Sequence, residues 1–429
     1  MNEAFLQYIW QHKLLEEPLV TTDGQPLKVM RSGDLNLDAG PDFFNAHISI
    51  GSLEWVGSVE VHIHSSDWNR HGHSDDKSYD NVVLHVVYEH DADIVMSNGR
   101  TPPTLELRGR IPGHVLAHYE ALMNPPSTAE VPCAQWLKSV PPFTLHSWME
   151  RLTVERIERK TADVERLLNH ANGSWTDCCY LVVARYFGGR TNAFAFEMLA
   201  KATPLGVVAK IKDDLFRIEA LLFGQAGMLE QDFDDDYPLR MQTEYRYMRK
   251  AYNLTPIDGT WWKFFRLRPS GFPTLRISQF AALLHRSHGL FSQLLDNNDA
   301  ALLRHSFEVE ASAYWRDHYR FDRPSKAAHG VQTGEAMACN LIINAWVPLL
   351  FEYGVKHDDE SLRERAYLLL QQLPPEDNNI VRMWKGLGVE ADSAAQSQAL
   401  IQLHNEYCGN KKCLNCHLGS RILRIVEPC

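Results

Sequence analysis

A short stretch near the N-terminus concentrates side chains that can bind a metal ion. Seven of the 20 histidines lie between residues 47 and 90. Glu60, His62 and His64 alternate along one apolar segment, and alternate side chains of a β-strand share a face. A carboxylate and two imidazoles on one face can be adjacent ligands of a divalent cation. We therefore predict a metal site here, with Asp42 joining it from the preceding strand.

The loop after this segment adds further ligand-type side chains. His71 and His73 lie between Asp67 and Asp76. His85 lies within an otherwise apolar strand, where a buried polar side chain needs a hydrogen-bond partner. The alternative interpretation is a solvated strand face followed by a polar surface loop. For a functional site, the predicted catalytic residues are Asp42, Glu60 and His62, and the predicted metal ligands are Asp42, Glu60, His64, His71 and His73.

A β-hairpin must position these side chains. Residues 45–50 and 53–64 alternate as strands do, and Gly51-Ser52 between them is a typical short hairpin loop. Side chains on the two arms of a hairpin lie close together, so Asp42 can approach the site from the other arm. The other elements predicted for this part are strands over residues 82–89, 93–96 and 104–108 and a short helix over residues 4–15.

The chain changes character after residue 122. Residues 1–122 are predicted to form a mixed α/β domain. Residues 123–142 are predicted to be a proline-rich linker, because proline lacks an amide donor and has a fixed φ angle. Residues 143–429 are predicted to be all-α, with Ser174 and Ser393 as helix N-caps. The predicted fold class is therefore α+β, with a large helical region after the first domain.

A second metal site is predicted at the C-terminal end. Cys408, Cys413 and Cys416 follow the spacing Cys-x4-Cys-x2-Cys, and such closely spaced thiolates can converge on a zinc ion or an iron–sulfur cluster. Cys429 is predicted as a further ligand of this group. The candidates for the fourth position are Cys429, His417, His404 and Cys133. The alternative interpretation is a set of reduced cysteines that ends a helix.

The composition limits the possible functions. The chain has 429 residues, of which 45% are hydrophobic and 23% are charged, so a disordered or collagen-like protein is excluded. No segment approaches the roughly 20 apolar residues of a membrane span, and no secretory signal is evident, so we expect a cytoplasmic protein without membrane contact. The net charge of −11 argues against a broad basic surface for nucleic acid, but it leaves room for a local nucleic-acid site.

The order of the acidic residues resembles that of the PD-(D/E)XK nucleases. Pro41-Asp42 precedes an apolar strand and Glu60-Val61-His62 follows it, much as Asp and Glu lie on the hairpin of that family. The resemblance implies a restriction-endonuclease-like domain in which Asp42 and Glu60 hold Mg²⁺ or Mn²⁺ for the cleavage of DNA or RNA. His62 stands where the family has lysine, so it would position or deprotonate water. One distant cysteine with three near the C-terminus is also similar to the iron–sulfur clasp of some of these nucleases.

Over essentially its whole length, the chain also resembles an uncharacterised bacterial family known only as a domain of unknown function. The motifs that carry this resemblance are GPDF, VEVH, SDW-x-x-H-x-H, LHVV and the terminal cysteine group. The resemblance supports the unity of the chain but implies no reaction. Three functions therefore stay open: a metal-dependent nuclease or phosphodiesterase, a cupin-like zinc or iron enzyme, and a non-catalytic scaffold or binding module with a structural zinc or iron–sulfur site.

Overall fold

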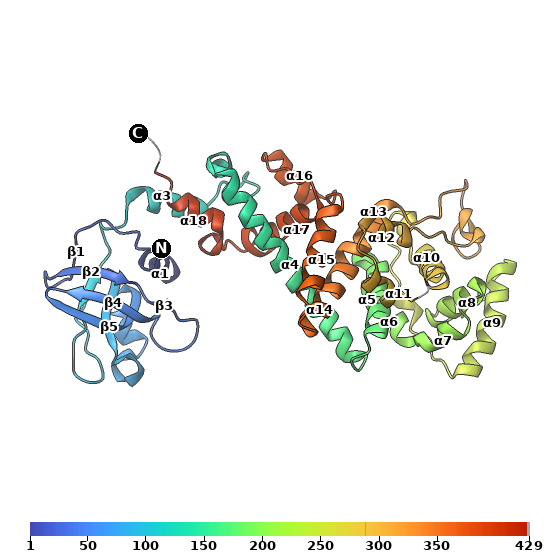
Figure 1. Ribbon diagram of the computed structural model, residues 1–429, viewed down its shortest axis with the longest axis horizontal. Coiled ribbons are helices and arrows are strands. Elements are labelled where there is room, and N and C mark those ends of the chain that lie inside the picture. The colour runs from blue at the N-terminus through green and yellow to red at the C-terminus, as the bar shows by residue number, and fades with distance from the viewer. Residues whose placement is uncertain (288, 427–429) are drawn as a thin grey trace. The chain divides into compact units, whose positions relative to one another are not determined.

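The computed structural model describes residues 1–287 and 289–426 and separates into two compact units (Figure 1). The sheet unit consists of residues 1–145 and 404–429, and the helical unit consists of residues 146–403. A mixed β-sheet dominates the first unit, whereas the second is built mainly of α-helices. The predicted fold class is confirmed. The segment 404–429 groups with the sheet rather than with the helices that precede it in the sequence.

The sheet is built around a long hairpin. Its strands are β1 (Leu19–Val20), β2 (Pro26–Arg31), β3 (Asp34–Leu35), β4 (Phe43–Ile50), β5 (Leu53–His64), β6 (Val82–Glu89) and β7 (Thr104–Glu106). Their order is β1-β2-β4-β5-β6-β7, with β3 paired to β4. β4 and β5 pair antiparallel with Ile50 opposite Leu53, so the predicted hairpin is confirmed. The pairs β5–β6 and β6–β7 are parallel, which makes the sheet mixed.

The two edges of the sheet approach each other. The amide of Thr22, just after β1, donates a hydrogen bond of 2.8 Å to the carbonyl oxygen of Thr104 in β7. The sheet is therefore nearly closed into a barrel. Glu60 and Val61 alternate along β5 and so point to opposite faces, yet they are only 5% and 1% exposed. Both faces of the central strand are thus covered, including the face that carries the predicted ligands.

One predicted strand does not form. Residues 93–96 lie in an irregular segment, so the prediction of a strand there is wrong. Ile94 and Met96 are buried in a small apolar cluster with Trp68 and Val82. The alternation of this segment therefore reflects a loop that packs its apolar side chains onto the sheet, without a ladder of backbone hydrogen bonds.

Short helices complete the sheet unit. They are α1 (Glu3–Gln11), α2 (Asp67–Arg70), α3 (Gly113–Met123) and α18 (His417–Leu423), with 3₁₀ turns η1 (His73–Asp75), η2 (Lys77–Tyr79), η3 (Ala134–Ser139) and η9 (Cys413–Asn415). The Asn2 side chain caps α1 by accepting a hydrogen bond of 3.0 Å from the amide of Phe5. α1 packs against β5, and α18 lies beside α3 (Figure 1). The Tyr8 hydroxyl donates to Ser420 Oγ at 2.7 Å, which ties α1 to the C-terminal segment.

The helical unit is formed by helices that follow one another along the chain. They are α4 (Pro142–His170), α5 (Trp175–Phe187), α6 (Gly189–Ala202), α7 (Leu205–Lys210), α8 (Leu215–Gln225), α9 (Asp236–Tyr252), α10 (Pro273–Arg286), α11 (Leu290–Asp296), α12 (Ala300–Phe307), α13 (Glu335–Leu341), α14 (Val347–Lys356), α15 (Glu360–Gln372), α16 (Asn379–Gly386) and α17 (Ala394–Gln402), with the short strands β8 (His318–Arg320) and β9 (Arg323–Pro324). Ser174 and Ser393 cap α5 and α17 by accepting hydrogen bonds from the amides of Asp177 and Gln396, as predicted.

One continuous helical stretch, Glu335–Lys356, belongs to the core of the helical unit. It joins α13, a π-helical turn η7 (Ile342–Trp346) and α14. Its length and composition would suffice to cross a membrane, but 78% of its apolar window is buried inside the structure, as is usual for a core helix. Trp346 is fully buried and meets the ring of Phe307 edge-on, with 5.1 Å between the ring centroids.

Candidate metal centre

Two carboxylates meet where the hairpin begins. The amide of Asp42, just before β4, donates to Glu60 Oε2 at 3.0 Å, and the amide of Val61 donates to Asp42 Oδ2 at 3.0 Å. Gln7 Nε2, from α1, donates to Asp42 Oδ1 at 2.8 Å. These donors hold both carboxylates in place. Glu60 Oε1 is left on the side of the neighbouring histidines.

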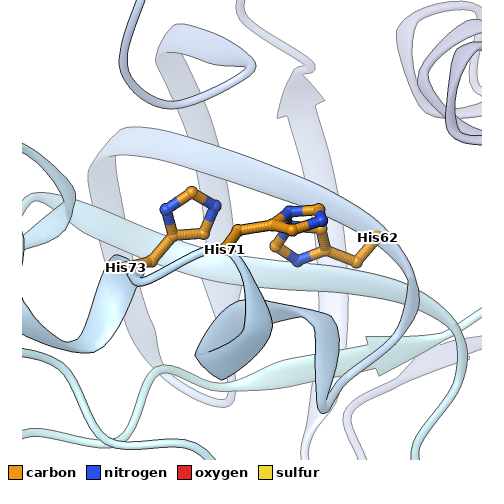
Figure 2. A group of neighbouring side chains, drawn as sticks. All are labelled: His62, His71 and His73. Atoms are coloured by element: carbon orange, nitrogen blue, oxygen red, sulfur yellow. Dashed lines mark hydrogen bonds between the residues drawn. The ribbon is translucent and has the colours of Figure 1, made fainter.

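Three imidazoles gather beside Glu60. His62 comes from β5, His71 from the end of α2 and His73 from η1. Figure 2 shows these three side chains grouped together. His62 Nε2 lies 3.2 Å from His71 Nδ1 and 3.4 Å from Glu60 Oε1. His73 Nε2 lies 3.3 Å from the same Glu60 oxygen. Ligand atoms of the three histidines all lie within 4.8 Å of one another.

These separations suit a small divalent cation. In a tetrahedral zinc site the metal–nitrogen distance is about 2.0–2.1 Å, which places neighbouring donor atoms about 3.3 Å apart. Three of the separations among Glu60 and the histidines are 3.2, 3.3 and 3.4 Å, and the ligand atoms of the three histidines all lie within 4.8 Å of one another. Imidazole nitrogens with a carboxylate oxygen form a donor set that suits zinc and iron(II). The residues therefore fit a metal ion in both donor type and spacing.

Burial keeps the central imidazole neutral. His62 is 1% exposed, and burial, together with the nearby His73 and His71, lowers its pKa to about 3. A neutral imidazole keeps a lone pair that a metal can use, whereas a protonated imidazole has none. The close approach of His62 to Glu60 is therefore a contact between two potential ligands and not an ion pair.

The neighbouring carboxyl group is shifted in the opposite direction. Burial, reinforced by the charge of Glu60, raises the pKa of Asp42 to about 7. Two ionised carboxylates so close together repel each other, and a nearby cation relieves that repulsion. The electrostatics of the Asp42–Glu60 pair thus favour a bound cation, in agreement with the donor geometry.

Residues around the histidines orient their rings. His62 Nδ1 lies 2.9 Å from His85 Nε2, and both residues are buried. When His62 Nδ1–H donates to His85 Nε2, His62 Nε2 keeps its lone pair on the side of the other ligands. The ring of Tyr79 stacks on His73 with 3.8 Å between centroids, and Trp68 meets the His73 ring edge-on at 5.4 Å. These contacts restrict ring rotation and so prepare the site for a ligand.

The structure brings together most of the predicted site residues. Asp42, Glu60, His62, His71 and His73 are those that meet. His64 is not part of this group: it ends β5, and its amide donates to the buried Asp67 Oδ2 at 3.1 Å. Asp76 is exposed, and its side chain caps η2 instead.

The sequence indicates one of the two residues that support the site but not the other. His85 is recognisable, because a histidine inside an apolar strand needs a partner, and that partner is His62. Gln7 is not recognisable, because a single glutamine in an amphipathic helix is ordinary and its contact with Asp42 joins residues that are 35 positions apart. Only the packing of α1 on β5 reveals it.

The predicted cysteine ligands are largely buried. Cys413 and Cys416 are buried and Cys408 is half-buried, and these described cysteines form no disulfide bond. Within residues 1–287 and 289–426, the histidines are the group whose ligand atoms all lie within 4.8 Å, and the thiols do not form a second group of this kind. The predicted ligand Cys429 lies outside the described residues.

Comparison with known proteins identifies a family but no activity. A family model described as "Protein of unknown function (DUF2851)" matches residues 3–379. No curated protein and no solved structure matches the chain at a significant level. The predicted likeness to a family of unknown function is thus confirmed over nearly the whole chain. None of these comparisons points to a nuclease, so the PD-(D/E)XK resemblance stays a prediction.

Proposed function

Because the chain belongs to the DUF2851 family, whose function is unknown, we propose an activity from the site itself: a metal-dependent hydrolase centred on His62, His71 and His73. A divalent ion bound there would polarise a substrate oxygen and activate water. The three imidazoles would hold the ion, with Glu60 Oε1 beside two of them. Asp42 would act as a positioning residue, because its amide binds Glu60 Oε2.

The observation that carries this proposal is the convergence of the three imidazoles, one of which is exposed. His62 and His73 are buried, whereas His71 at the end of α2 is exposed. Catalytic metal sites keep one position open to water or substrate, whereas structural sites close it. The side on which His71 lies is therefore where a substrate would enter.

Phosphodiesters are the first substrate class to test. The Asp42 and Glu60 carboxylates lie beside the histidines. In the metal-assisted hydrolysis of a phosphodiester, a divalent ion stabilises the developing charge and activates water, and carboxylates help to hold such an ion. The nitrogen donors favour zinc or iron(II), while Mg²⁺ and Mn²⁺ prefer oxygen donors. Both kinds of ion belong in the assay, because the sequence alone predicts Mg²⁺ or Mn²⁺ at the carboxylates.

Metal binding and hydrolysis can be measured on the same preparations. The full chain is stripped of metal, reloaded with Zn²⁺, Mn²⁺, Fe²⁺ or Mg²⁺, and assayed with bis(p-nitrophenyl) phosphate, single-stranded DNA and RNA. We expect His62→Ala to lose one bound ion per chain, and Glu60→Gln to lose ion-dependent cleavage. His64→Ala is the matched control on the same strand and should keep both. An unchanged metal content in His62→Ala would contradict the proposed site.

A structural ion is the second candidate, and burial favours it. Glu60, His62 and His73 are 5%, 1% and 9% exposed, which is typical of a closed site. In that case the ion binds through the same histidines and stabilises the sheet unit, but none of the three substrates is cleaved. Metal binding without cleavage would therefore select the structural role.

A further inference from the structure

We propose that Cys133 joins Cys408, Cys413 and Cys416 as a ligand of an iron–sulfur cluster in the sheet unit. Cys133, Cys413 and Cys416 are each only 7% exposed, and Cys408 is half-buried. None of these four cysteines is in a disulfide bond. This centre shares no residue with the histidine group and goes beyond the proposed hydrolase function.

Consecutive tight turns bring the three C-terminal cysteines together. The Lys411 amide donates to the Cys408 carbonyl at 3.1 Å, and the Cys416 amide donates to the Cys413 carbonyl at 3.3 Å. A Cβ atom on Gly419 would lie 2.0 Å from the Cys413 carbonyl oxygen, so only glycine lets η9 pack against the first turn of α18. The backbone therefore folds closely around the cysteine segment instead of extending past it.

The fold also carries Cys133 to this segment. Cys133 lies just before η3, in the stretch that follows α3, and α3 packs against α18. Lys411 Nζ donates to the carbonyl oxygen of Met123, the last residue of α3, at 2.9 Å. Trp136 of η3 also meets the ring of His118 in α3, with 5.4 Å between the ring centroids. The C-terminal cysteine segment and the chain around Cys133 therefore contact the same helix.

The four thiols are near enough to influence one another. The Cys133 thiol interacts electrostatically with Cys416 and Cys413, and the Cys408 thiol interacts with Cys133, Cys416 and Cys413. Ligation to a metal deprotonates a thiol and neutralises the charge of the thiolate, so a metal centre allows several thiolates to lie close together.

The spacing of the sulfur atoms favours a cluster over a single ion. Around one tetrahedral zinc ion, with zinc–sulfur distances of about 2.3 Å, neighbouring sulfur atoms lie about 3.8 Å apart. The described thiols do not form a group whose sulfur atoms all lie within 4.8 Å of one another. In a [4Fe–4S] cluster each cysteine binds a different iron atom, so the sulfur atoms are spread more widely than around one ion. Buried thiols that gather in one part of the sheet unit, without forming so tight a group among the described residues, match this second arrangement.

The test is the iron, acid-labile sulfide and zinc content of the full chain purified without oxygen, together with its visible absorption spectrum. We expect iron and sulfide in the wild-type chain, and loss of both, with the visible absorbance, in Cys133→Ser. The matched control is Cys339→Ser, which changes a buried cysteine of the helical unit and should keep the cluster. His62→Ala should also keep the cluster, so failure of the hydrolase site and failure of this one are distinguishable.

Each other outcome overturns part of the proposal. Iron and sulfide retained in Cys133→Ser would remove Cys133 from the ligands. Zinc in place of iron would overturn the cluster, and no metal in the wild-type chain would overturn the centre. If Cys133→Ser does not fold, the wild-type chain still distinguishes a cluster from bound zinc. An iron–sulfur cluster bleaches on exposure to oxygen and gives an electron paramagnetic resonance signal in one redox state, whereas zinc does neither.

Discussion

Two buried carboxyl groups, one in each unit, have similar burial and opposite surroundings. In the helical unit, Glu219 is 1% exposed, and its oxygens accept hydrogen bonds from Ser278 Oγ and the Tyr237 hydroxyl. In the sheet unit, Glu60 is 5% exposed, and its Oε1 faces two imidazole nitrogens at 3.3 and 3.4 Å. Both oxygens of Glu219 thus accept hydrogen bonds from hydroxyl groups. Glu60 accepts a hydrogen bond from the Asp42 amide on Oε2 only, and its Oε1 faces imidazole nitrogens that can carry lone pairs.

This difference separates a structural polar cluster from a candidate metal site. A buried carboxyl group whose neighbours donate hydrogen bonds is satisfied within the protein, and it can also take up a proton. A neutral imidazole carries one N–H donor and one lone pair, so a cation can satisfy imidazole lone pairs and a carboxylate oxygen that converge on one point. Burial alone therefore does not identify a functional site; the donor or acceptor character of the neighbours does.

The largest effect that would sharpen this comparison is metal-dependent stability in the sheet unit only. Free Zn²⁺ at a thousandfold excess over its dissociation constant should stabilise the folded site by about 4 kcal/mol, because the ion binds the folded state. Hydrogen exchange in peptides from β5 measures this gain. The gain should vanish in His62→Ala and persist in Glu219→Gln, and equal gains in both variants would break the comparison.

The next effect is a pH dependence that belongs to the helical unit. Burial raises the pKa of Glu219 from its usual 4.5 to about 7. Its contribution to stability is therefore fully present below pH 4.5 and is lost as the pH rises through about 7, by roughly 3 kcal/mol. Hydrogen exchange in peptides from α8, corrected for the intrinsic rate at each pH, measures the loss. Glu219→Gln should show a flat profile, and a variant that kept the wild-type slope would assign it to another group.

A smaller effect is expected from the residue that supports His62. Replacing His85 by phenylalanine keeps a ring in the apolar strand but removes the partner of His62 Nδ1. Loss of such a supporting hydrogen bond usually weakens metal binding about 10–100-fold. Zinc titration calorimetry on His85→Phe measures this, with His47→Phe as the control, because His47 is a half-exposed residue of β4 that contacts Glu54 instead of the site. Unchanged zinc affinity in His85→Phe would show that the imidazoles orient themselves without it.

The smallest effect tests the donor-rich surroundings of Glu219. Tyr237→Phe removes one hydroxyl donor but leaves Ser278 in place, so the loss should be about 1 kcal/mol, the usual net value of one hydrogen bond. Tyr247→Phe, at an exposed position of α9, should change little. Denaturant unfolding of the helical unit at pH 5, where Glu219 is protonated, measures both, and a loss in neither variant would mean that the hydroxyl is dispensable.

Local sequence patterns predict much of the fold. The hairpin at residues 45–64 is found from strict alternation and a Gly-Ser loop, and the caps at Ser174 and Ser393 from residue type and position alone. These features depend on backbone geometry over a few residues, so the local sequence contains the information. The prediction of a strand at residues 93–96 is wrong because it also relies on local alternation alone. The buried side chains of a loop can alternate in the same way without any strand pairing.

The candidate site is less completely predicted, because its residues belong to different elements. The alternation of Glu60 and His62 correctly places them on one face of β5, but it cannot tell whether that face meets solvent or α1. The distance of 3.2 Å between His62 and His71 depends on where α2 lies on the sheet. Sequence spacing alone would have grouped His64 with these ligands equally well.

By itself, the sequence determined which side chains are available: carboxylates and imidazoles within residues 42–85 and thiols near the C-terminus. It also determined the hairpin that carries them, because strand alternation and turn residues act locally. Only the tertiary structure decided that Glu60 faces two histidines, that Gln7 supports Asp42, and that the chain around Cys133 and the C-terminal segment contact the same helix, α3. The physical reason is that such contacts join residues far apart in the chain, and packing of the whole unit, rather than any local preference, sets their distances.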